Sequence, residues 1–112
     1  MLSNKRNYKQ SLTNIINVTT LNDMQITFDE AKDIANQSKH GSPLSDTAKL
    51  EWVNAVIWQD TRRDYGEARM ITLAVIGERV YCVVYVIRNE VRRIISLRKA
   101  NYKEVVNYAN QN

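Results

Sequence analysis

The chain has 112 residues, of which 44% are hydrophobic and 25% charged, and it has a net charge of +4. This composition is ordinary for one globular domain with one modest core. No apolar run approaches the roughly 18 residues that span a bilayer, and the N-terminus lacks the apolar segment of a secretory signal. We therefore expect a cytoplasmic protein with no membrane contact. A single cysteine, Cys82, rules out an internal disulfide framework and is expected in the core.

Positive charge is concentrated at the end of the chain. Residues 88–112 include six basic and two acidic side chains, so this segment alone has a charge of +4, equal to that of the whole chain. The sequence pI is near 9.3. A local positive field of this kind favours a polyanion or an acidic partner.

Residues 1–23 are rich in Asn, Ser and Thr and have no sustained apolar period, so we expect a weakly structured extension there. Met24 begins "MQITF", which alternates as a short strand does. The sequence therefore predicts a folded domain at 24–112, and Met24 is a candidate start of the protein.

Two short helices should follow this strand. The segment "DEAKDIANQSKHG" is expected to begin at a cap provided by Thr27 or Asp29 and to end before Gly41. Ser42-Pro43 then predicts the cap and first turn of a second helix, which should run to about Leu50. The first helix has a narrow apolar stripe that we expect to face the core: Ala31, Ile34, Ala35 and Ser38.

Four strands are predicted next. "WVNAVIW" is one, and after the polar loop "QDTRRDYGE" come "ARMITLAVI", "RVYCVVYVI" and "VRRIISL". The last three are joined by loops of two or three residues, which predicts an antiparallel meander. The middle strand is apolar on both faces, so we expect helices to cover one face and a subunit or partner to cover the other.

A last helix closes the predicted fold. Asn101 and Glu104 have the spacing of a capping box. The order strand, helix, helix, four strands, helix (β-α-α-β-β-β-β-α) is typical of an α+β domain. The last helix also has an apolar stripe that should dock on another element: Tyr102, Val105, Val106 and Ala109.

The sequence excludes several common catalytic centres. One Cys and one His are too few for a zinc cluster, and the chain has no P-loop, dinucleotide fingerprint or nucleophile elbow. Asp60, Asp64 and Glu67 are close in sequence and could hold magnesium, but we expect them to be solvated acids of a surface loop. We predict neither a metal nor another cofactor.

A set of guanidinium and ammonium groups remains, together with one histidine and a few glutamates. This set suits metal-free cleavage of RNA, in which the ribose 2′-hydroxyl attacks the neighbouring phosphate. The reaction needs a base, an acid and positive charge for the anion that develops on the phosphoryl oxygens. Arginine supplies a permanent charge and a fork that matches two phosphate oxygens.

The stretch "RRIISLRKA" poses a geometric question. Arg93 and Arg98 would point to opposite faces of an unbroken strand, so they can converge only if the strand ends or bulges before Arg98. We expect the strand to end there. In an antiparallel meander, Arg69 should lie at the same end of the sheet as Arg92 and Arg93, with Glu67 two residues before it.

Each candidate residue also has a purely structural interpretation. Arg92 could blunt the edge of the sheet, and we expect that role unless it faces the same pocket as Arg69. His40 could be only the last residue of a capped helix, and Glu67 with Arg69 could be a surface ion pair. Both tryptophans are expected in the core or an interface, not as platforms for base stacking: Trp52 and Trp58.

Three segments, in this order, resemble signatures of the BrnT family of toxins. "FDEAKDIANQSKHG" resembles the opening signature, which ends in Lys-His-Gly. "YGEAR" resembles the Glu-x-Arg motif, and "RRIISLRKANYKEVVNYA" resembles the closing signature. The likeness runs from Met24 to about Ala109.

The resemblance implies a RelE-like fold, with helices packed on a small, mostly antiparallel sheet. It implies the toxin of a type II toxin–antitoxin pair, an endoribonuclease that inhibits growth. The implied partners are the RNA substrate and a BrnA-like ribbon-helix-helix antitoxin, with operator DNA bound only through that antitoxin. A dimeric toxin–antitoxin assembly is expected.

The resemblance also assigns roles to residues. Arg69, Arg93 and Arg98 are expected to hold the phosphate and its transition state. Glu67 is expected to be the base or to orient an arginine, and His40 is a candidate acid or base because the ordinary pKa of histidine is about 6.5. The expected RNA-binding residues are Lys39, Lys99 and Arg92. The alternative is a non-catalytic RNA- or protein-binding module on the same fold.

Overall fold

The computed structural model describes residues 24–112, so the extension expected at 1–23 lies outside the described residues. The described elements are β1 (Ile26–Phe28), α2 (Glu30–His40), the 3-10 helix η1 (Leu44–Lys49), β2 (Glu51–Gln59), β3 (Met70–Ile76), β4 (Arg79–Arg88), β5 (Val91–Lys99) and α3 (Tyr102–Gln111). Within this range, no helix is long and apolar enough to cross a membrane.

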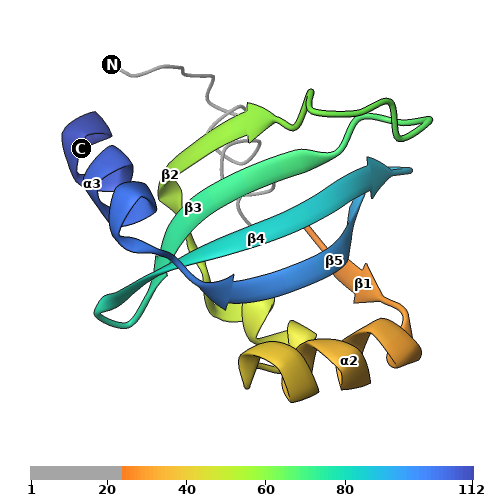
Figure 1. Ribbon diagram of the computed structural model, residues 1–112. Coiled ribbons are helices and arrows are strands. Elements are labelled where there is room, and N and C mark those ends of the chain that lie inside the picture. The colour runs from red at the N-terminus through yellow and green to blue at the C-terminus, as the bar shows by residue number, and fades with distance from the viewer. Residues whose placement is uncertain (1–23) are drawn as a thin grey trace, which may run out of the picture.

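The five strands form one mixed sheet in the order β1-β5-β4-β3-β2 (Figure 1). β1 pairs in parallel with β5, and the other neighbours are antiparallel. The prediction of an α+β fold with a meander is therefore confirmed. The turn from β4 to β5 is made by Asn89 and Glu90, both with positive φ (51° and 65°), as a two-residue turn with a matching twist requires.

The helix α2 begins and ends with the predicted chemistry. The side chain of Asp29, rather than Thr27, accepts a hydrogen bond from the backbone N–H of Lys32 (3.1 Å) and caps the N-terminus. Gly41 follows the last turn in the left-handed conformation (φ 77°), which glycine adopts without steric cost.

The packed face of α2 is polar, so the predicted apolar stripe is wrong. Ala31, Ile34, Ala35 and Ser38 are all exposed, Ile34 by 61%. The buried residue of the helix is Asn36. Its amide donates to the backbone carbonyls of Ser42 and Leu97 (both 2.8 Å) and accepts from the N–H of Leu97 (3.1 Å).

These contacts have a simple cause. β1 pairs with β5 only from Arg92 to Ile94, so the backbone groups of Leu97 face outward at an open edge of the sheet. Buried backbone groups need hydrogen-bond partners, and an asparagine side chain can both donate and accept. The helix therefore covers this edge with an amide instead of an apolar stripe.

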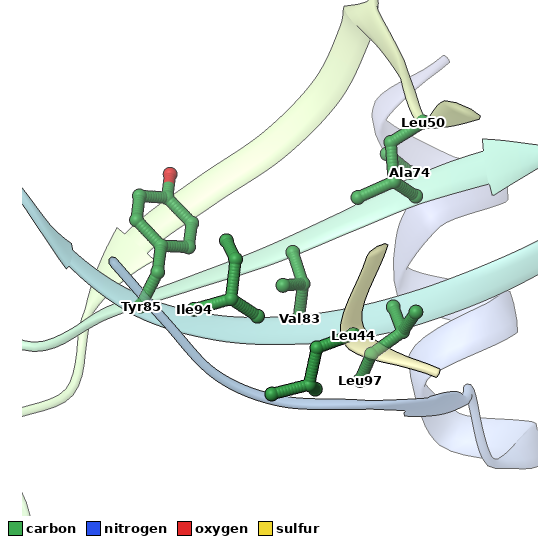
Figure 2. Packing of buried hydrophobic residues seen from close by; sticks show 7 residues of the cluster. All are labelled: Leu44, Leu50, Ala74, Val83, Tyr85, Ile94 and Leu97. Carbon is green, nitrogen blue, oxygen red and sulfur yellow. The ribbon is translucent and has the colours of Figure 1, made fainter. Parts of the chain in front are cut away.

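The second predicted helix is a single 3-10 helix, η1, rather than an α-helix that begins at Ser42. Pro43 is the residue before its first turn, and no side chain caps it. Leu44 and Leu50, at its two ends, are buried. They pack in the main core with residues of β3, β4 and β5 (Figure 2): Ala74, Val83, Tyr85, Ile94 and Leu97.

Both faces of β4 are covered, as its sequence predicts. The main core lies on the face toward α2 and η1. A smaller cluster of Leu73, Cys82 and Ala100 lies on the other face, with Tyr108 of α3 packed against it. The chain itself therefore covers the part of the second face around Cys82, where a partner was expected.

The last helix, α3, has the predicted capping box. The side chain of Asn101 accepts from the N–H of Glu104 (2.9 Å), and the carboxylate of Glu104 accepts from the N–H of Asn101 (2.8 Å). Its apolar stripe is not docked, which contradicts the prediction. Tyr102, Val105, Val106 and Ala109 are exposed, and Tyr108 makes the contact with the sheet instead.

The sequence analysis expected β5 to end before Arg98, and this expectation is wrong. The strand runs to Lys99 and contains a β-bulge. Ile94 pairs with Tyr85 and Ser96 pairs with Val84, so Ile95 is the extra residue. A bulge shifts the alternation of side chains by one position. After the bulge, Ser96 and Arg98 point to the same face of the sheet as Arg93.

Replacing Asn36 with Ala should destabilise the fold strongly. The change leaves the N–H and C=O of Leu97 buried without their partners, and each such group costs about 1–3 kcal/mol. We expect the free energy of unfolding in urea to fall by about 2–4 kcal/mol. The matched control is Ser38→Ala on the exposed side of the same helix. Equal losses for the two variants would contradict this account of α2.

Candidate cationic site on the sheet

One cross-strand row is central to the face of the sheet that contacts α3, which we call the α3 face. Met70 pairs with Tyr85, so the same register places Arg69 opposite Val86. Val86 in turn pairs with Arg93. Arg69 and Arg93 therefore lie in one row, with Val86 of β4 between them. This agrees with the predicted end of the sheet for both residues.

Glu67 extends this cluster and is held by an arginine that the sequence analysis did not select. Arg88, the last residue of β4, donates from Nε (3.1 Å) and Nη2 (2.6 Å) to the two carboxylate oxygens of Glu67. The hydrogen bonds from Arg88 lower the pKa of Glu67, and the charges of Arg69 and Arg93 act in the same direction. Glu67 is therefore an ionised carboxylate among three arginines. We call these four residues the arginine cluster.

Arg69 is positioned by the loop that precedes β3. Its guanidinium lies 3.9 Å from the centre of the Tyr65 ring, a cation–π contact. The Tyr65 hydroxyl donates to the buried carboxylate of Asp60 (3.0 Å), and the backbone N–H of Asp60 donates to the carbonyl of Arg69 (2.8 Å). The Nε of Arg69 is buried and has no protein hydrogen-bond partner. Tyr65 thus holds the side chain of Arg69, and Asp60 holds its backbone.

Asp60 is not a solvated loop acid, which corrects the expectation from sequence. Its side chain is 1% exposed and accepts two hydrogen bonds from the guanidinium of Arg62 (2.9 and 2.8 Å) and one from the Arg62 backbone (3.1 Å). The hydrogen bonds from Arg62, with that of Tyr65, lower the pKa of Asp60 far below its usual range. A buried carboxylate in such a network organises the loop.

Arg98 lies on the α3 face but is engaged with α3. Its Nη1 and Nη2 donate to the two oxygens of Glu104 (both 2.8 Å), the glutamate of the capping box. This pair ties β5 to the start of α3. Arg98 lies five positions after Arg93 along β5, which corresponds to about 15 Å of strand. The bulge brings the two arginines to one face, but it does not bring them to one point.

His40 lies near Arg98 rather than in the arginine cluster. It ends α2, which packs along β5, and it is half-buried. Burial lowers the pKa of His40, and the charges of Lys39 and Arg98 add to that effect. Lys39 and Lys99 are exposed at the same end of β5. The predicted site residues therefore fall into two groups: Glu67, Arg69 and Arg93 at one end, and Lys39, His40, Arg98 and Lys99 at the other.

Arg92 is neither an edge charge nor part of the arginine cluster. β1 pairs with it, so its strand has no free edge there. Its side chain is buried against the opposite face of the sheet, with the guanidinium 3.6 Å from the centre of the Trp52 ring and 5.7 Å from that of Tyr85. Burial lowers the pKa of Arg92. Trp52 lies in the core as predicted, whereas Trp58 is 37% exposed on the α3 face.

The residues 24–112 contain no group of three or more His, Cys, Asp or Glu side chains arranged to hold a metal ion. The acids considered for magnesium have protein partners instead. Asp60 is paired with Arg62, and Glu67 is paired with Arg88.

The fold and this cluster define a small α+β protein with a cationic sheet face, an arrangement suited to a phosphate-containing ligand. A comparison with protein families shows the family to which the chain belongs. Residues 28–104 match the family described as "Ribonuclease toxin, BrnT, of type II toxin-antitoxin system". The chain therefore belongs to the BrnT family of ribonuclease toxins. A search of curated proteins found no match.

The Asp60 network should make stability depend on pH. A carboxylate whose pKa is lowered in the folded state stabilises the fold above its unfolded pKa, near 4, and this stabilisation is lost as the pH falls below it. We expect Asp60→Asn to lower the Tm at pH 7. The difference from the wild type should shrink as the pH falls through about 4. Asp64→Asn, an exposed acid of the same loop, is the control, and a pH-independent difference for Asp60→Asn would contradict the assignment.

The neighbouring residues Arg92 and Arg93 should differ sharply in how much each side chain contributes to the stability of the fold. Arg92→Ala removes a desolvated cation–π contact and the packing of a long side chain, and it should cost about 2 kcal/mol or more. Arg92→Met keeps much of that packing and should cost less. Arg93→Ala, one residue along and on the α3 face, should leave the free energy of unfolding within about 1 kcal/mol of the wild type. Equal losses for Arg92→Ala and Arg93→Ala would refute the buried role of Arg92.

Proposed function

We propose that this chain is an active, metal-independent endoribonuclease, the toxin of a type II toxin–antitoxin pair, with a RelE-like fold. The observation that carries the proposal is the arginine cluster. Arg69 and Arg93 lie in one row of the sheet, and Arg88 lies beside them. Three guanidinium groups around one position supply the positive charge that the phosphoryl transition state needs.

The proposed chemistry is attack of a ribose 2′-hydroxyl on the adjacent phosphate, with departure of the 5′ oxygen. Arg69 and Arg93 hold the phosphoryl oxygens through their guanidinium groups, whose fork of donors matches two phosphate oxygens. Preorganised donors of this kind cost no reorganisation during the reaction. The Tyr65 ring below Arg69 supplies that preorganisation.

Glu67 orients the arginines in this proposal. Its two oxygens are occupied by Arg88, and its lowered pKa makes it a weak proton acceptor near neutral pH. This favours the orienting role over that of general base, the two roles that the sequence left open. His40 keeps a lowered pKa and is neutral near pH 7, so it can accept a proton, but it does so beside Arg98.

Arg93 and Arg98 contact different phosphates in this proposal. They share a face of the sheet but are separated by about 15 Å of strand. An RNA strand laid along β5 would meet the arginine cluster first and then the group formed by Arg98, His40, Lys39 and Lys99. Lys39 and Lys99 supply long-range attraction for RNA, and Arg92, buried on the other face, is left out of the RNA-binding set.

The partners follow from membership of the family. A type II toxin has a cognate antitoxin, and we propose that it is BrnA-like, with a ribbon-helix-helix part that binds operator DNA. We also propose a dimeric toxin–antitoxin assembly. The second candidate function is a non-catalytic RNA- or protein-binding module. It is favoured by the two bidentate ion pairs, Glu67–Arg88 and Arg98–Glu104, which occupy groups that catalysis would use.

Induction of the full chain without an antitoxin should arrest growth and degrade RNA. Removing one transition-state donor typically costs about 10²–10³ in rate. Arg69→Ala and Arg93→Ala should therefore relieve the arrest and lower RNA cleavage by the purified protein by that factor. Arg79→Ala, which removes the same charge at the opposite end of the sheet, is the matched control.

The same assay distinguishes the two candidate functions and tests whether cleavage needs a metal ion. Cleavage that persists in EDTA supports the metal-independent mechanism, and cleavage lost in EDTA contradicts it. An intact RNA pool with unimpaired growth would favour the non-catalytic module. Salt-sensitive RNA binding is expected for both functions and therefore does not separate them.

A further inference from the structure

A hollow of about 340 Å³ lies on the α3 face, next to the arginine cluster. Its floor is apolar, formed by Ile71, Val84 and Cys82. Ile71 pairs with Val84, so these two belong to the row directly beside the row of Arg69 and Arg93. Adjacent rows on one face are about 7 Å apart.

An aromatic side chain stands at one side of this floor. Trp58 pairs with Ile71, lines the hollow and is 37% exposed. It differs from Trp52, which packs in the main core. Trp58 therefore lies outside the main core, and its partly exposed ring lines a hollow that a ligand can enter.

Planar cations complete the walls of the hollow. On the Trp58 side, Asp60 holds the guanidinium of Arg62 by two hydrogen bonds while the Arg62 side chain stays 78% exposed. On the opposite side, the pair of Arg98 and Glu104 closes the wall. Each carboxylate of the rim is matched by an arginine, Asp60 by Arg62 and Glu104 by Arg98, so the rim has no net charge and presents guanidinium groups beside the apolar floor.

We propose that this hollow binds one nucleobase of single-stranded RNA, turned out of its stack and laid against Trp58. Sequence-specific recognition of RNA uses unstacked bases packed on aromatic rings or arginine planes. An apolar floor with few polar groups at the rim suits such a ring. The phosphate of the same strand then lies one row away, at Arg69 and Arg93. The inference rests on the proposed function only in taking RNA as the ligand, because it does not require cleavage.

The arrangement makes the hollow a determinant of cleavage position. A base held against Trp58 sets which phosphate of the strand reaches the arginine cluster. The carboxylates that border the hollow are engaged by arginines, so discrimination between bases comes from the shape of the floor and from the Arg62 and Arg98 donors. Wild-type cleavage should therefore depend on the base at one position relative to the scissile bond.

Short 2′-O-methyl RNA oligonucleotides test the hollow, because they bind without being cleaved by 2′-hydroxyl attack. Binding to the full chain is measured for one sequence and for versions with a single abasic site at each position. We expect one abasic position to weaken binding about tenfold, the size of a lost base–aromatic stack. Trp58→Ala should weaken binding of the intact oligonucleotide to the same extent. The Trp58→Ala variant should then bind the abasic version as well as it binds the intact oligonucleotide.

Matched variants separate stacking from folding. Ile57→Ala alters the next residue of β2, which is 48% exposed and points to the other face, and it should bind as the wild type does. Trp58→Phe keeps a smaller ring and should bind between the wild type and Trp58→Ala. The abasic series on the wild-type protein needs no variant, so it decides the matter even if Trp58→Ala fails to fold.

The outcomes separate this inference from the proposed function. If every abasic position binds equally, or if the losses from Trp58→Ala and from the abasic site simply add, the base pocket is refuted. If the wild type cleaves the all-ribose RNA without any base dependence, the pocket fails while the ribonuclease stands. If base-dependent binding occurs without cleavage, the ribonuclease fails while the pocket stands. If the wild type neither binds nor cleaves, both fail.

Discussion

The register of β3, β4 and β5 is the constraint on which the site depends. The two-residue turns Gly77-Glu78 and Asn89-Glu90 set which residues face each other, and they place Arg69, Val86 and Arg93 in one row. A shift of one residue would send the arginines to the opposite face. The bulge at Ile95 applies such a shift to half of β5 alone. It leaves Arg93 on the α3 face and brings Arg98 there as well, while Ile94 and Leu97 stay in the core.

The neighbours Arg92 and Arg93 are the same residue type but have different roles, because they point to opposite faces of the sheet. Arg92 is buried against Trp52 and contributes to the fold, whereas Arg93 faces the arginine cluster. Alternation alone predicts that they point apart, and the two-residue turns predict which residue each one faces. The same register, extended beyond the end of β3, places Arg88 opposite Glu67. The contact between Arg88 and Glu67 therefore follows from the lengths of the turns.

The helices show where sequence patterns mislead. Apolar spacing selects Ile34 in α2 and Val105 in α3 as packed residues, and both are exposed. In α2 the contact is made by Asn36, because the open edge of β5 presents backbone groups that need hydrogen bonds. A pattern of apolar residues identifies the apolar face of a helix. It does not report whether the surface that meets the helix within the same chain is apolar or polar.

The sequence by itself determined the α+β class, the family, the capping box of α3, the glycine that ends α2 and the end of the sheet at which Arg69 and Arg93 lie. These features depend on neighbours in the chain or on short turns, so local chemistry is enough to specify them. Only the tertiary structure decided that β5 bulges instead of ending and that Arg98 pairs with Glu104. It also decided that Asp60 is buried and that Trp58 borders a hollow. The bulge and the hollow depend on packing across the sheet, and the contacts of Asp60 and Arg98 depend on how the loop and α3 fold back. In both cases the sequence shows residue types but not which of them meet.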